Sequence, residues 1–162
     1  MRRTLRYLVL SVTPAAGLAC TPPPTNFTEF VPAYSSVWVD EKFPQLPAVQ
    51  VESVEIRRTA QSKPDLCGYQ SILTLRLHWP GNRAFPIDQM GFYIRVVSGN
   101  LPSGLFPREP VSIVRADGPK ADIRVSWQDD PAGKQKPLSF TIELIPIDRW
   151  LHLGPNTVKK VP

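Results

Sequence analysis

The side chains with the most obvious chemistry in this sequence are two histidines, two cysteines and a pair of adjacent aspartates. His78 and His152 are far apart in the chain, and neither has a neighbouring residue spaced as a metal ligand, so we interpret both as exposed, neutral side chains. Asp129 and Asp130 are followed by Pro-Ala-Gly, which adds none of the side-chain oxygens that a calcium ion needs. We therefore expect a solvated turn there, with no metal and no cofactor.

Motifs that support catalysis are missing from the sequence. It contains no glycine-rich phosphate loop, no Gly-x-Ser-x-Gly elbow and no cluster of Cys and His at metal-binding spacing. Glu52, Glu55 and Glu143 alternate with apolar residues, as outward-facing positions of strands do. We expect no catalytic residue, and an enzyme of unrecognised type stays as an alternative.

The first 19 residues have the pattern of a secretory signal peptide. Arg2, Arg3 and Arg6 precede an uncharged run, Tyr7–Ala19, that ends in small residues. The run is shorter than the roughly 20 residues of a membrane-spanning helix. Without these arginines the mature part holds 19 − 3 = 16 basic residues against 14 acidic ones. This near balance gives no support for nucleic-acid binding.

The end of this segment, Gly17-Leu18-Ala19-Cys20, resembles a bacterial lipobox, in which the cysteine becomes the lipidated first residue. Ala19 fits that pattern, whereas Gly17 and Leu18 depart from it. The resemblance implies a lipid anchor at Cys20 that attaches the protein to a membrane. Because Thr21 stands where Asp tends to retain lipoproteins in the inner membrane, it also implies the outer membrane.

The alternative is ordinary cleavage after Ala19, which gives a soluble secreted or periplasmic protein. Lipidation would leave Cys67 as a free thiol. Otherwise a disulfide between Cys20 and Cys67 is possible in the oxidising compartment.

Residues 20–47 are predicted to form a tether, because six prolines after Cys20 favour an extended chain. Aromatic residues within it are unusual for a disordered linker. We expect Val31–Phe43 to dock on the following domain, with Val37–Val39 as a short edge strand. Contact of these aromatics with a partner protein is the alternative.

The clearest structural signal is Ser71–Trp79, in which Leu73, Leu75, Leu77 and Trp79 recur at every second residue. This spacing predicts a strand with one apolar side, which has to be buried against a second layer. Six further strands are predicted, and they span Val49–Arg58, Gly91–Ser98, Val111–Arg115, Asp122–Trp127, Leu138–Ile147 and Asn156–Val161.

About seven strands in residues 48–162 predict an all-β domain, a two-sheet antiparallel β-sandwich. In the first strand the apolar phase slips at Ser53, which predicts either a β-bulge or a point where the strand crosses between the two sheets. In the third, Phe92, Ile94 and Val96 are expected on one side.

Three segments resemble fibronectin type III domains, or more broadly immunoglobulin-like sandwiches. Leu75–Pro80 is similar to the second strand of that family, Gly91–Val96 to its third, and Phe140–Leu144 to its sixth. Phe140 stands near the position of the family's corner tyrosine, and Pro146 where a small residue is usual. The resemblance implies a non-catalytic domain that works by binding.

Two connections are candidate binding loops, because loops on rigid sandwiches commonly carry binding residues. The first contains Arg149, Trp150, Leu151 and His152, with the Trp and Arg typical of interface hot spots. The alternative is that Leu151 and Leu153 hold this loop on the core while Trp150 covers the end of a sheet. The second lies within Gly99–Pro110 and contains Leu101, Leu105 and Phe106.

We therefore expect an exported, lipid-anchored protein of the bacterial cell envelope with a binding or structural role. Its expected partner is another envelope protein or a glycan. An accessory subunit of a secretion or surface assembly is the alternative.

Overall fold

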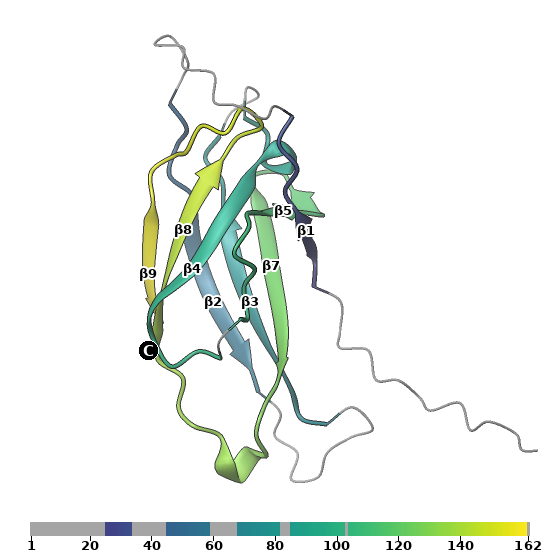
Figure 1. The fold of residues 1–162 in the computed structure, drawn as a ribbon, viewed down its shortest axis with the longest axis vertical. Helices are drawn as coiled ribbons and strands as arrows, with labels where there is room; N and C mark the ends of the chain where they lie inside the picture. The colour runs from purple at the N-terminus through teal and green to yellow at the C-terminus, as the bar shows by residue number, and fades with distance from the viewer. Residues whose placement is uncertain (1–24, 34–44, 59–67, 82–84, 103, 162) are drawn as a thin grey trace, which may run out of the picture.

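The computed structural model describes residues 25–33, 45–58, 68–81, 85–102 and 104–161. These residues form two antiparallel sheets that face each other across a shared apolar core (Figure 1). The predicted all-β, two-sheet antiparallel sandwich is therefore confirmed.

One sheet has five strands in the order β1-β5-β4-β8-β9, and the other has four in the order β2-β3-β7-β6. The strands of the first sheet are β1 (Phe27–Glu29), β5 (Val111–Ile113), β4 (Gly91–Gly99), β8 (Phe140–Ile147) and β9 (Thr157–Val161). Those of the second are β2 (Gln50–Arg57), β3 (Gln70–His78), β7 (Lys120–Gln128) and β6 (Ala116–Asp117). Two single-turn 3₁₀ helices complete the described elements, η1 (Ile87–Gln89) and η2 (Ala132–Lys134).

β3 is a central strand, paired along its length with β2 on one side and β7 on the other. Leu73, Leu75 and Leu77 are fully buried, as the period-two pattern predicts. Trp79, just beyond the strand, packs edge-to-face against Phe92 of the opposite sheet, with ring centroids 6.0 Å apart. This contact joins the two layers at one end of the core.

All seven predicted strands are present, and the bulge predicted at Ser53 is confirmed by a register shift between Val51 and Ser53. β1 and β6 were not predicted. β1 lies within the range expected to be a tether, yet it pairs with β5 along its length. Its neighbour Phe30 is buried over Gly91, where any Cβ atom would approach the Phe30 ring to 2.5 Å. The expected edge strand Val37–Val39 lies outside the described residues.

The end of β4 is less buried than its start. Phe92 and Ile94 are buried, but Val96 is 40% exposed and Val97 is 53% exposed. β5 pairs with β4 only at Gly91 and Phe92, and the register between β4 and β8 shifts between Val96 and Ser98. Within the described part of the chain, the second half of β4 therefore has a neighbouring strand on one side only.

Among the described residues, no helix combines the length and the apolar character that crossing a membrane requires. Cys20 and Cys67 both lie outside the described residues, so lipidation and the state of the thiol stay predictions.

Replacement of Leu75 by Ala tests the period-two assignment on which the fold depends. Leu75→Ala should lower the free energy of unfolding by about 3 kcal/mol, because it leaves a cavity in a fully buried site. Thr74→Ala, one residue away on the outer face of the same strand, should cost less than about 1 kcal/mol. Urea denaturation measures both, and equal costs would contradict the assignment.

Candidate functional site

The first predicted binding loop is a tight turn built on a buried carboxylate. Asp148 is 1% exposed, and its Oδ1 accepts hydrogen bonds from the backbone N–H groups of Trp150 and His152, each at 2.9 Å. Its Oδ2 lies 2.9 Å from Nδ1 of His152. Leu151, between the two donors, has a positive φ of 69°. Such a loop is fixed from within, because one side chain satisfies several backbone groups.

Of the four residues predicted as the binding surface, only Arg149 lines one of the larger cavities among the described residues. The Arg149 guanidinium stacks on the Trp150 ring, with its central carbon 4.1 Å from the ring centroid. Leu151 and His152 are half-buried. Leu153 is 61% exposed, so the alternative in which it holds the loop on the core is wrong for this residue. Asp148 had not been singled out in the sequence, although an Asp before a turn is a recognised signal.

The second predicted loop does line a cavity. Leu101, Leu105 and Phe106 are half-buried and pack against the edge of the core. Together with β4 they form a groove of about 670 Å³, which we call the β4 groove. Its lining residues are Ile94, Arg95, Val96, Leu101, Pro102, Gly104, Leu105, Phe106, Pro107 and Arg108.

The wall of the β4 groove is held at both ends. At the start of the loop, the backbone N–H of Asn100 donates to the carbonyl of Ser139 at 3.1 Å, and its side chain accepts from the N–H of Ser139 at 2.7 Å. At the far end, the N–H of Phe30 donates to the carbonyl of Pro110 at 2.9 Å. The loop therefore spans two fixed points and keeps its apolar side chains in place.

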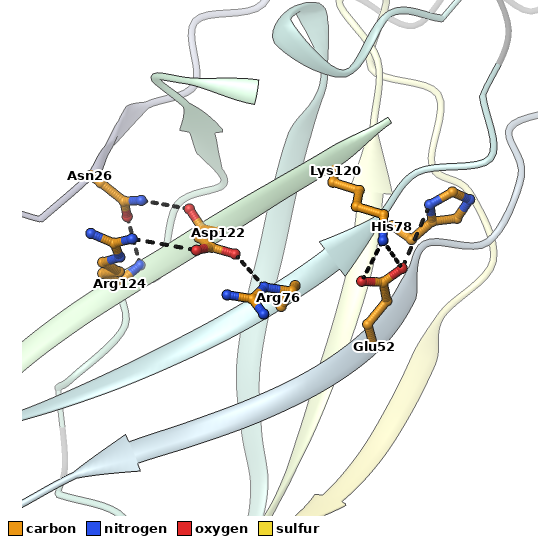
Figure 2. A network of polar contacts seen from close by, with 7 residues as sticks. All are labelled: Asn26, Glu52, Arg76, His78, Lys120, Asp122 and Arg124. Atoms are coloured by element: carbon orange, nitrogen blue, oxygen red, sulfur yellow. Dashed lines mark hydrogen bonds and ion pairs between the residues drawn. The ribbon is translucent and has the colours of Figure 1, made fainter. Parts of the chain in front are cut away.

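A network of charged side chains covers the outer face of the four-stranded sheet (Figure 2). Glu52 lies 3.1 Å from Nζ of Lys120 and 3.9 Å from Nδ1 of His78. His78 was expected to be exposed, but most of its side chain is buried, with 31% exposed. Within the described chain its buried Nδ1 has no hydrogen-bond partner.

The other half of the network centres on Asp122. Its carboxylate lies 3.1 Å from Nε of Arg76 and 3.4 Å from Nη2 of Arg124. Asn26, just before β1, donates to the backbone carbonyl of Asp122 and accepts from the N–H of Arg124, both at 2.6 Å. Figure 2 shows these side chains pointing toward one another across neighbouring strands. The charged side chains are therefore largely paired with one another. The hydrogen bonds of Asn26 join the N-terminal segment to this sheet.

The aspartate pair after β7 is not a solvated turn. Asp129 forms two hydrogen bonds of 2.6 Å with the Arg58 guanidinium and accepts another, of 2.7 Å, from the Ser71 hydroxyl. The side chain of Asp129 is 7% exposed. The hydrogen bond from Arg58 lowers the pKa of Asp129 to about 2, and the Ser71 hydroxyl acts in the same direction. This bidentate pair ties together the ends of β2, β3 and β7.

Comparison with protein-family models, with curated proteins and with solved structures found no match for this chain. No group of three or more His, Cys, Asp or Glu side chains among them is arranged to hold a metal ion. Among the open grooves lined by described residues, the β4 groove is the one that contains the predicted binding residues Leu101, Leu105 and Phe106.

The Arg58–Asp129 pair predicts how stability depends on pH. The pKa of Asp129 is about 2 in the folded protein, below the roughly 3.9 of an unfolded aspartate, so the pair stabilises the fold above pH 4 and loses its effect as pH falls toward 2. Asp129→Asn should lower the free energy of unfolding by about 2 kcal/mol at pH 7, and the gap from wild type should close between pH 4 and 2.

Denaturation at a series of pH values measures this gap. The exposed neighbour is the control, because Asp130→Asn should leave the unfolding free energy almost unchanged at every pH. A gap for Asp129→Asn that stays constant down to pH 2 would contradict the assignment.

Proposed function

We propose that this chain is an exported, lipid-anchored, non-catalytic protein of the bacterial cell envelope that binds another envelope protein through the β4 groove. The observation that carries the binding role is the groove itself, with an apolar wall held at both ends on a rigid sandwich. The signal-like residues 1–19 and Cys20 support export and lipid anchoring.

We also propose that the sandwich is immunoglobulin-like, and the strand order supports this. With β2, β3, β4, β6, β7, β8 and β9 lettered A to G in chain order, one sheet has the order A-B-E-D and the other contains C-F-G. This is the arrangement of immunoglobulin constant-type domains. β5 lies beside strand C, and β1 extends that sheet further.

The composition of the β4 groove favours a protein partner over a glycan. Leu101, Leu105 and Phe106 give it an apolar wall, as in the centres of protein interfaces. Recognition of sugars depends instead on many polar groups directed at hydroxyls. The charged network on the opposite sheet is a weaker candidate, because most of its side chains already pair with one another.

The lipid anchor is tested by metabolic labelling with radioactive palmitate. The wild-type chain should incorporate label and sediment with membranes, whereas Cys20→Ala should lose the label, because the acylated sulfur is gone. Cys67→Ala is the matched control and should label normally. Equal labelling of wild type and Cys20→Ala would contradict lipidation at Cys20.

The binding role is tested by site-specific photo-crosslinking in intact cells. A benzoyl-phenylalanine at Val96, which lines the β4 groove, should give a discrete adduct with another protein. The same residue at Glu55, on the outer face of the other sheet, should not. Absence of an adduct from Val96, with normal folding and export of the variant, would contradict the proposal.

A further inference from the structure

The second half of β4 has an open main-chain edge. On the side facing away from β8, β5 pairs with β4 only at Gly91 and Phe92. From Tyr93 to Gly99, no backbone hydrogen bond joins this side to any other segment in the described part of the chain. In an antiparallel sheet the backbone groups of a strand point alternately to its two sides, so this edge presents unpaired N–H and C=O groups, regularly spaced up to the register shift between Val96 and Ser98.

The β4 groove opens along this same edge. Ile94, Arg95 and Val96 all line it, although they are consecutive residues of one strand. Consecutive side chains of a strand point to opposite faces of the sheet. A cavity that touches all three therefore lies beside the strand, and its other wall is formed by Leu101, Pro102 and Gly104–Arg108.

The groove has different chemistry on its two sides. On the side of the core, Ile94 and Val96 continue into the apolar wall of the loop. On the outer side, Arg95 points away from the core, with its guanidinium carbon 5.5 Å from the centroid of the Tyr93 ring. Arg108 is exposed, and no acidic residue lines the groove. Neither arginine forms an ion pair within the described chain.

We propose that an extended segment of a partner protein binds here as an added strand beside β4, with apolar side chains alternating with acidic ones. The inference rests on the proposed binding function and names its mode of recognition. The unpaired edge requires a peptide backbone, because only this supplies donors and acceptors at matching intervals. Its inward side chains meet the apolar wall, and its outward carboxylates meet Arg95 and Arg108.

A second copy of this chain fits the edge less well. Pairing β4 with β4 would bring the Arg95 and Arg108 side chains of two copies together, and like charges across an interface oppose association. The register shift between Val96 and Ser98 also distorts the edge, as bulges do where strand edges are protected from self-pairing. An acidic partner segment meets the same register shift but not the repulsion between like charges, so charge favours it over a second copy.

The test uses the full chain, with Cys20→Ser to keep it free of lipid, and a phage-displayed library of random peptides about nine residues long. Enriched peptides should alternate apolar and acidic residues. In an added strand, every second N–H points toward β4. N-methylation of these residues should abolish binding, whereas N-methylation of the residues between them should be tolerated. Amide signals of Tyr93–Gly99 should shift on binding in nuclear magnetic resonance spectra.

Reversal of charge tests the role of the arginines. The double variant Arg95→Glu, Arg108→Glu should weaken binding of the enriched peptides by about tenfold or more. The matched double variant Lys134→Glu, Lys136→Glu, which reverses two exposed charges outside the groove, should change it less than about twofold.

Three results would overturn the inference. They are the absence of any enriched peptide, binding that ignores both N-methylation and charge reversal, and self-association in sedimentation that depends on the β4 edge. If the Val96 photo-adduct persists in any of these cases, the proposed binding function stands and only the added-strand mode is wrong.

Discussion

The fold depends on burying the inner side of β3 against the opposite sheet. β3 has a hydrogen-bonded neighbour on each edge, so its leucines are held in one plane facing β4 and β8. Trp79 closes one end of this interior, because its Nε1 donates to the carbonyl of Phe85 at 2.7 Å and its backbone N–H donates to that of Pro119 at 2.7 Å. A core fixed in this way keeps the strand edges and loops around it in place, which is what a preformed binding surface needs.

Alternation along the sequence predicts which way a side chain points, and this was enough for the strands with full-length neighbours. The alternation does not show whether another strand lies beside a given residue. Val96 has the right phase for burial, but β5 begins only at Val111, which pairs with Phe92, so it does not extend alongside Val96. β1 was not predicted for a related reason. A strand of three residues is too short for an alternating pattern to show in the sequence. Its place depends on the space above Gly91, which appears only in the folded protein.

The polar residues were harder to interpret, because their partners are distant in the sequence. Arg58 and Asp129 are 71 positions apart, and Asn26 and Asp122 are 96 apart. The sequence around an aspartate does not show whether its side chain is solvated or is hydrogen-bonded to residues of other strands, as Asp129 is. The turn at Asp148 is the exception, since its partners are two and four residues away. That local pattern is visible in the sequence, and it explains how the loop of Trp150 keeps its shape.

Comparison with β9, an edge strand of the same sheet, shows why the open part of β4 is unusual. β9, at one edge, carries Lys159 and Lys160, and charged side chains of this kind discourage pairing with other chains. The open half of β4 instead carries the exposed Val96 and Val97 beside an apolar groove. Stability alone would favour a longer β5 at this position, because it would pair the open backbone groups of β4. An edge that is left open, and whose flanking loop is fixed at both ends, is better explained by a strand that another molecule supplies.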